Sequence, residues 1–347
     1  MLFLIDPSSF QSTWKGRAQY LLFLGFFLLE LFTARKKLLK NKFGLIKRKR
    51  TLAIGAAMAA PTIYVISVSM FGLSHAVIEI GELFGAGQYG EWFLKDSWPL
   101  SLEYLILTGL FTVSIKLVYK IKGLKQFLAS LFFLGATGTF YMIDTFYPYG
   151  TFTALQSFVP FTASSVTLVL DWMGYGTRLL AGPYGAVHML VGGPTGGAHW
   201  YLYWPCAGVH NFFIYTLVIP FLLKDFSFCP QRKVIYAFVP RKLRFAAKSN
   251  RLFPFLERRV FHTAITVAET SFINILRTIP IYLIIVIGAV GTFTMNVLRI
   301  VSISTIGSKI GSESAQLFHN YRGELYFVVW LIIYLIILLT LSRRIRA

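Results

Sequence analysis

Residues 201–223 read YLYWPCAGVHNFFIYTLVIPFLL, an apolar segment that is long enough to enter a membrane and has a proline and a cysteine near its start. We predict a membrane helix over residues 206–223, with Cys206 at its N-terminus. A helix N-terminus carries about half a positive elementary charge and unpaired N–H groups, and both favour a thiolate. Cys206 is therefore a candidate nucleophile, although a single cysteine in a membrane segment is more often only a small apolar residue.

The composition predicts an all-α polytopic membrane protein. Hydrophobic residues make up 56% of the 347 residues, charged residues make up 14%, and the mean hydropathy is +0.63. The net charge of +20 comes from basic clusters beside apolar runs, which marks cytoplasmic loops rather than a nucleic-acid surface. The sequence contains no phosphate-binding loop, metal-ligand spacing or nucleic-acid module, so we expect no cofactor, no metal and no nucleic-acid partner.

The apolar runs predict about seven transmembrane helices, within a range of six to eight. They are residues 18–34, 52–73, 100–119, 127–143, 206–223, 279–303 and 325–341. On this topology 27 of the 34 Lys and Arg residues lie on the cytoplasmic side, which fixes the orientation. We divide the chain into residues 1–150, with the first four helices, and residues 151–347, a catalytic region with the last three helices and a basic cytoplasmic loop at 224–278.

The segment between the fourth and fifth spans is predicted to stay at the outer face. An even number of crossings must separate those two spans, so we interpret 151–173 as a helix lying in or dipping into the outer interface. The following Gly- and Pro-rich residues predict a short β-like cap. Whether 18–34 and 151–173 cross the membrane fully stays open at this point.

This orientation brings a thiol, a guanidinium and an imidazole to one interface. Cys206 starts one span, Arg299 lies about one turn from the outer end of the next, and His319 precedes the last. An arginine inside a membrane segment is costly and by default suggests a function or a buried partner. Asn296 lies on the same predicted helical face as Arg299 and is expected to orient it.

Such a set supports acyl transfer, with Cys206 attacking a carbonyl, His319 moving protons and Arg299 stabilising negative charge. Each residue also has a plainer interpretation: Arg299 as a snorkelling side chain and His319 as a loop histidine. Arg322 and His210 compete with His319 for proton transfer. His210, four residues after Cys206, is predicted to lie on the same helix face about 6 Å deeper, and more often such a residue is a buried polar group.

Three short motifs carry a resemblance to the exosortase and archaeosortase family: CAGV at 206–209, NVLR at 296–299 and FHNYRG at 318–323. Their order and membrane placement cover roughly residues 154–341. The length, the histidine and the basic loop favour an archaeal branch, the thaumarchaeosortases. Two departures stand out: Ala207 replaces a serine that is frequent in the family, and some archaeal members use an arginine in the third position, which brings in Arg322.

The resemblance implies a multi-pass cell-membrane cysteine peptidase and transpeptidase with its active site at the extracellular face. Its expected partners are secreted proteins that end in a sorting motif, a hydrophobic helix and a basic tail, and a membrane lipid as acceptor. It implies Cys206 as nucleophile, Arg299 as electrostatic helper and His319 as general base. The alternatives from other classes are a multi-span transporter and a non-catalytic membrane assembly protein.

Overall fold

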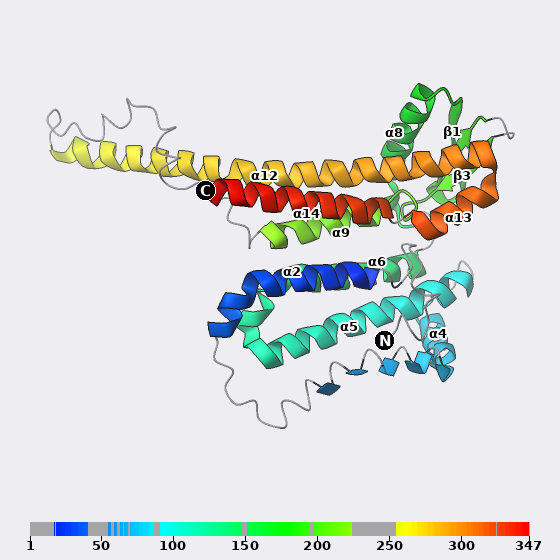
Figure 1. The fold of residues 1–347 in the computed structure, drawn as a ribbon, viewed down its shortest axis with the longest axis horizontal. Coiled ribbons are helices and arrows are strands. Elements are labelled where there is room, and N and C mark those ends of the chain that lie inside the picture. The colour runs from blue at the N-terminus through cyan, green and yellow to red at the C-terminus, as the bar shows by residue number, and fades with distance from the viewer. Residues whose placement is uncertain are drawn as a thin grey trace. The chain divides into compact units, whose positions relative to one another are not determined.

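The computed structural model describes residues 17, 19–40, 71–86, 91–147, 151–193, 197–223, 255–323 and 325–346, and short pieces between 55 and 70. Within 91–97 and 255–281 it describes the backbone only. These residues are mostly helical (Figure 1). The helices are α2 (Gln19–Lys40), α4 (Leu73–Leu83), α5 (Glu91–Leu124), α6 (Leu128–Phe146), α7 (Thr153–Gln156), α8 (Val159–Trp172), α9 (Val209–Leu223), α12 (Phe255–Ile310), α13 (Ser312–Arg322) and α14 (Leu325–Arg346).

Several helices in the described residues are apolar enough to indicate a membrane protein. Four stretches are long enough to cross a membrane: Trp98–Ile121, Thr153–Trp172, Tyr282–Ile310 and Ser312–Leu338. α9 is also apolar but shorter. The count of seven spans, the orientation and the interfacial position of 151–173 stay predictions, and the predicted span at 52–73 is described only in short pieces.

The chain divides into two compact units. The first comprises Met1–Leu222 and Ala289–Leu331, and the second comprises Leu223–Gly288 and Ile332–Ala347. Within the second unit, the buried hydroxyl of Tyr334 donates a hydrogen bond to the carbonyl of Ile284 at 3.0 Å, which ties α14 to α12. The residues that matter for the candidate site all belong to the first unit.

In the first unit, α2, α5 and α6 pack through aromatic rings. Tyr104 of α5 lies between Tyr20 and Tyr141, with ring centroids 4.6 and 5.5 Å away. Gly138 of α6 faces the same helix, where an added Cβ would come within 3.0 Å of Leu105. A glycine at this position therefore lets the backbones of α5 and α6 approach closely, as small residues do at membrane helix interfaces.

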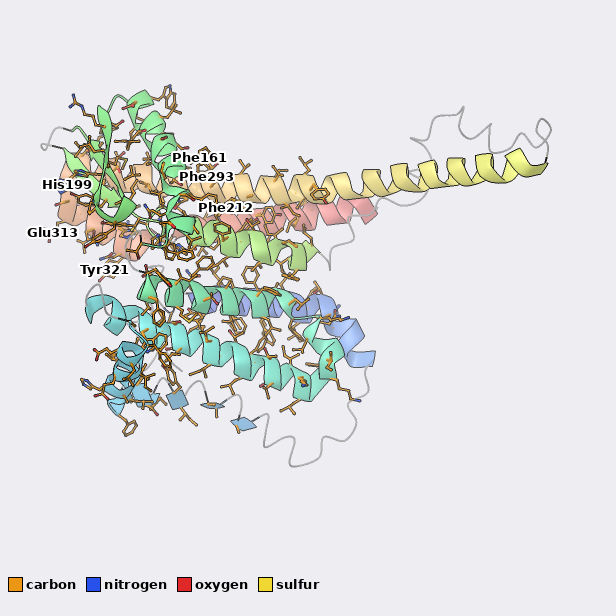
Figure 2. All side chains as sticks on the ribbon, turned by 180° about the vertical axis from the view of Figure 1, so that it is seen from behind. Phe161, His199, Phe212, Phe293, Glu313 and Tyr321 are labelled. Atoms are coloured by element: carbon orange, nitrogen blue, oxygen red, sulfur yellow. The ribbon has the colours of Figure 1, made fainter. Side chains whose placement is uncertain are left out.

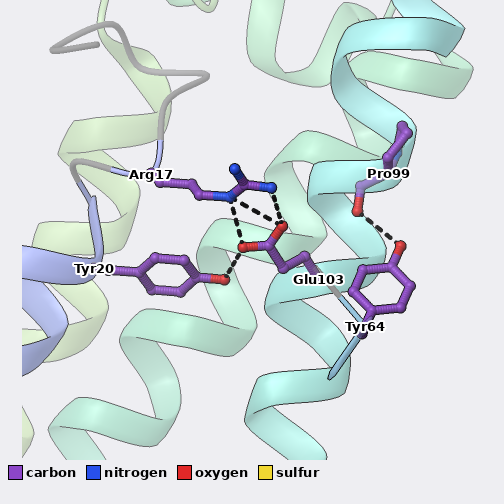
Figure 3. Close-up of polar contacts among 5 residues, drawn as sticks. All are labelled: Arg17, Tyr20, Tyr64, Pro99 and Glu103. Atoms are coloured by element: carbon purple, nitrogen blue, oxygen red, sulfur yellow. Dashed lines mark hydrogen bonds and ion pairs between the residues drawn. The ribbon is translucent and has the colours of Figure 1, made fainter. Parts of the chain in front are cut away.

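A buried ion pair joins the start of the first described helix to α5 (Figure 3). Arg17 donates from Nε and NH2 to the carboxylate of Glu103, at 3.0 and 2.9 Å, and the Tyr20 hydroxyl donates to the same carboxylate at 2.7 Å. Arg17 is 8% exposed and Glu103 is 3% exposed. The charges are thus removed from solvent and satisfied by each other.

Breaking this pair from one side is expected to cost more stability than removing both charges. Glu103→Gln leaves the Arg17 guanidinium buried without its counter-ion, a loss of about 3–5 kcal/mol by comparison with other buried pairs. Arg17→Met combined with Glu103→Gln removes that charge while the amide oxygen still accepts from Tyr20, so the double variant should be the more stable of the two. Thermal unfolding in detergent measures both, and equal unfolding midpoints would contradict the expectation.

Glu30, the acid that interrupts the apolar run of α2, is 3% exposed and caps the N-terminus of α6. Its carboxylate accepts the backbone N–H groups of Ala129 at 2.7 Å and Ser130 at 3.1 Å, and also the Ser130 hydroxyl. A carboxylate at this end of a helix satisfies unpaired N–H groups and interacts favourably with the positive end of the helix dipole. Glu30 is thus a structural acid.

Between α8 and α9 the chain forms a three-stranded antiparallel sheet, where the sequence predicts a β-like cap. Its strands are β1 (Thr177–Ala181), β2 (Val187–Val191) and β3 (Ala198–Leu202), in the order β1-β2-β3. A single 3-10 turn, η2 (Pro183–Gly185), connects β1 to β2. That this sheet caps the outer face of a membrane stays a prediction.

The predicted division of residues 224–303 into a loop and a separate span differs from the structure. Residues 224–254 lie outside the described residues, and α12 runs as one helix of 56 residues from Phe255 to Ile310. Pro280 lies inside it, and membrane helices tolerate proline in this way. The helix continues through Gly307 beyond the predicted end at 303, and it ends before Gly311, whose φ of 115° is a conformation that glycine adopts readily.

Candidate active site

Cys206 lies in a turn, residues 204–208, that precedes α9. The turn closes with a hydrogen bond from the Val209 N–H to the Trp204 carbonyl at 3.2 Å, and Gly208 has a left-handed φ of 66°. Because that conformation interrupts the helix, α9 begins at Val209 and the prediction that Cys206 opens the helix is wrong. The charge of a helix N-terminus therefore does not explain the environment of this thiol.

Two side chains of α12 hold the peptide groups around Cys206. Arg299 donates from NH2 to the carbonyl oxygen of Cys206, and Asn296 donates from Nδ2 to the carbonyl oxygen of Ala207. Arg299 is 4% exposed and Cys206 is half-buried. The structure thus brings together three of the residues that the sequence singled out, although their roles in catalysis stay predictions.

Gly208 is required at its position for two reasons. Its left-handed backbone disfavours a side chain, and a Cβ there would overlap the side-chain amide of Asn296. The absence of a Cβ lets Asn296 approach the backbone of the turn and reach the carbonyl of Ala207. Glycine at this position therefore permits the contact between α12 and the cysteine turn.

Arg299 lies farther from the end of its helix than the sequence predicts. α12 continues to Ile310, so Arg299 is eleven residues from its C-terminus, or about 16 Å at the rise of an α-helix. The predicted position, about one turn from the end of the span, is wrong. Arg299 is instead enclosed by the elements that pack around the last turns of α12.

α13 turns back after Gly311 and carries His319 (Figure 1). A Cβ on Gly307 of α12 would lie 3.5 Å from the Cβ of Ala315, so the two helices are in close contact. His319, one turn beyond Ala315, is thus a helical residue and not the loop histidine of the plainer interpretation. Its Nδ1 is buried with no hydrogen-bond partner among the described residues.

The two competitors of His319 occupy different environments. Arg322 lies in the last turn of α13 and is exposed. His210 is 3% exposed, in the first turn of α9, with its ring centroid 6.3 Å from that of Trp204. The prediction that His210 shares a helix face with Cys206 is wrong because the chain between them is not helical at Gly208, but the prediction of a buried residue is confirmed.

The sheet and α8 enclose the turn and the C-terminal half of α12. Trp204 is fully buried in the main apolar cluster, and its ring centroid lies 6.1 Å from that of Phe140. Phe161 of α8 stacks on Phe293 of α12 with ring centroids 4.9 Å apart (Figure 2). Gly193, after β2, comes so close to Ser308 that a Cβ there would lie 2.6 Å from its carbonyl oxygen. These contacts pack the turn against α6, and α8 and the sheet against α12.

Sequence reasoning missed one buried polar residue of this region, Gln156 at the end of α7. Its Oε1 accepts a hydrogen bond from the backbone N–H of Trp204 at 3.0 Å, and its Nε2 donates to the backbone carbonyl of Gly185 at 2.8 Å. The available signal was a single amide in an otherwise apolar stretch, which on its own does not identify a partner.

The remaining polar residues of the sheet do not join the cysteine turn. His188 stacks on Tyr201 with ring centroids 4.4 Å apart, whereas His199 and Arg178 are exposed. Within the residues that the structure describes, no group of three or more His, Cys, Asp or Glu side chains is placed to hold a metal ion. Cys229 lies outside the described residues.

Comparison with known proteins identifies no relative: no family model, curated protein or solved structure matches this chain. The residues around Cys206 and the resemblance carried by the three short motifs are therefore the features that bear on function.

Proposed function

We propose that the chain is a membrane-embedded cysteine peptidase and transpeptidase of the exosortase and archaeosortase type. Its substrates are secreted proteins that carry a C-terminal sorting motif, a hydrophobic helix and a basic tail. The enzyme cleaves after recognising this signal and transfers the new C-terminus to a lipid of the cell membrane. Its active site faces the outside of the cell.

The observation that carries the proposal is the hydrogen bond from Arg299 to the carbonyl of Cys206. A guanidinium that is 4% exposed on an apolar helix is costly to bury, so its placement needs a compensating role. Here it puts a permanent positive charge beside a cysteine residue, and a nearby cation favours the thiolate, which is the nucleophilic form.

In the proposed reaction, the Cys206 sulfur attacks the carbonyl carbon of the scissile peptide bond and its proton passes to His319. The positive charge of Arg299 stabilises the thiolate and the developing oxyanion. His319 returns the proton to the leaving amine as the C–N bond breaks, which leaves a thioester on Cys206. A lipid nucleophile then displaces the sulfur, and the proton it loses restores the thiol.

His319 is the preferred proton carrier because its environment suits the task better than those of its competitors. Its Nδ1 is buried and has no hydrogen-bond partner among the described residues, so the imidazole keeps one nitrogen that no other group uses. Arg322 is exposed and its guanidinium offers donors but no acceptor, and His210 is enclosed in the core. Arg322 and His210 are assigned supporting positions.

Trapping of the thioester tests the proposal. Membranes containing the tagged full-length chain are incubated with a secreted reporter protein that ends in a sorting signal from the native host, and the chain is isolated under denaturing conditions. We expect a peptide containing Cys206 to carry the reporter through a bond that neutral hydroxylamine cleaves. Cys229→Ala should keep the adduct and Cys206→Ala should lack it.

An adduct that survives in Cys206→Ala, or the absence of any adduct although the reporter is cleaved, would contradict Cys206 as nucleophile. If the chain neither binds nor cleaves any signal-bearing protein, the assembly or transport function is favoured.

A further inference from the structure

Gln156 bridges the connection between β1 and β2 to the turn that contains Cys206. It is 6% exposed, and both ends of its amide are engaged, with the Trp204 N–H at 3.0 Å and the Gly185 carbonyl at 2.8 Å. The two partners lie 48 and 29 residues away in the sequence. Gln156 is thus a long-range tie in the core of the first unit.

The orientation of this amide follows from its partners. The Trp204 N–H is a donor and requires the oxygen of the amide, whereas the Gly185 carbonyl is an acceptor and requires the nitrogen. A flipped amide would oppose donor to donor and acceptor to acceptor. Few other side chains of similar length satisfy both groups at once, because an ionised glutamate lacks the donor and lysine lacks the acceptor.

Gln156 binds the start of the cysteine turn, whereas residues of α12 bind its later part. The Trp204 N–H opens the turn, and Arg299 and Asn296 hold the two carbonyls near its close. Gly208, which has a left-handed φ, can adopt more backbone dihedral angles than a residue with a side chain. Restraint on both sides of Cys206 therefore comes from polar side chains of α7 and α12.

The second anchor of Gln156 is itself a rigid point. Gly185 has a φ of 77°, and Tyr184 before it has a φ of 53°, a conformation that is unusual for a bulky residue. Gly182 and Ala186 close the same connection through a hydrogen bond from the Gly182 N–H to the Ala186 carbonyl at 2.8 Å. Gln156 thus ties the cysteine turn to a tightly constrained loop of the sheet.

We infer that Gln156 is a positioning residue for the Cys206 nucleophile: it fixes the start of the turn to the β1–β2 connection and so sets where the thiol points. This inference rests on the proposed function only for its consequence in catalysis. The geometric claim is tested without any substrate.

The rate at which Cys206 is alkylated depends on how its thiol is placed, so it tests the geometric claim. In full-length protein carrying Cys229→Ser, Cys206 is the only thiol, and its reaction with iodoacetamide is followed by mass spectrometry between pH 6 and about pH 10, a range that spans ordinary thiol pKa values. We expect Gln156→Met, which keeps the size and loses both hydrogen bonds, to change the limiting rate of alkylation at least threefold, towards faster reaction as the turn loosens. Gln156→Glu retains an acceptor for the Trp204 N–H, so its rate should lie between those of Gln156→Met and the parent.

Gln126→Met is the matched control, since it makes the same chemical change in the turn between α5 and α6, where the Gln126 Oε1 is buried without a partner among the described residues. Its alkylation profile should equal that of the parent. Equal profiles for Gln156→Met and the parent in folded protein would overturn the inference, and so would a change of the same size in Gln126→Met. If Gln156→Met does not fold, Gln156→Glu decides: a rate equal to that of the parent overturns the inference.

Steady-state cleavage of the reporter separates the two proposals. Where Cys206 forms the thioester, Gln156→Met should lower kcat at least tenfold and leave KM within twofold, because the substrate-binding surface is retained. An altered alkylation rate with no thioester in the parent would keep the positioning role and reject the peptidase. A normal thioester in the parent with unchanged alkylation in Gln156→Met would do the reverse.

Discussion

Replacing Cys206 by alanine is expected to abolish release of C-terminal tails from secreted proteins in the native host. The reaction loses its only nucleophile, and removing the nucleophile of comparable covalent enzymes lowers kcat by more than about 10³-fold. Mass spectrometry of surface proteins measures the effect without a known substrate, because uncleaved proteins retain peptides from a hydrophobic helix and a basic tail.

The control for this variant is Cys229→Ala, which removes the other thiol of the chain and should leave processing unchanged. Both variants must accumulate in the membrane to the same level as the parent. Unchanged C-terminal peptides in the Cys206→Ala strain would reject the peptidase function. Loss of processing in Cys229→Ala alone would move the nucleophile to a residue that the structure does not describe.

The second large effect is expected at Arg299. Arg299→Met removes both the hydrogen bond to the Cys206 carbonyl and the positive charge at that residue's peptide group. Removal of one preorganised electrostatic contact of this kind costs about 10²–10³-fold in kcat in other acyl-transfer enzymes. We expect a loss of at least that size in reporter cleavage, and a rise in the pH at which Cys206 is alkylated, since the thiolate loses a stabilising cation.

Arg299→Lys separates charge from geometry. Lysine keeps the charge but lacks the planar fork of donors that reaches the carbonyl, so it should restore the alkylation profile better than it restores cleavage. Lys309→Met removes an exposed cation from the same helix and serves as the control, with activity close to that of the parent. Full activity in Arg299→Met would leave Arg299 only the plainer role of a buried side chain in the membrane.

Much of the fold follows from local patterns in the sequence. The spans predicted at 18–34, 100–119 and 127–143 correspond to α2, α5 and α6, because a long apolar run of good helix formers has few alternatives once its backbone must satisfy its own hydrogen bonds. The Gly- and Pro-rich stretch after α8 forms strands, in line with its turn residues and β-prone pieces. The end of α12 is less predictable, since polar residues after Ile303 resemble the end of a span while the helix itself continues.

The candidate site was predictable only in part. Arg299 could be paired with the region of Cys206 because an arginine in a predicted span needs a partner. Asn296 was expected to orient Arg299, whereas in the structure it donates to the Ala207 carbonyl. Gln156 could not be identified, since its two partners are backbone groups and therefore leave no trace in residue type. Neither could the turn at 204–208, because the left-handed φ of Gly208 depends on what packs against it.

The sequence alone determined that this chain consists mainly of apolar helices, and it singled out one thiol, one guanidinium and one imidazole in three separate segments. Hydropathy and helix formation depend on neighbours a few residues away, so they can be read along the chain. The tertiary structure decided that Cys206 lies in a turn rather than at a helix N-terminus. It also decided that the peptide groups of the turn are held from α7 and α12 by residues 48, 89 and 93 positions away. Those hydrogen bonds exist only after the helices have packed, because the packing sets which backbone groups each buried side chain can reach.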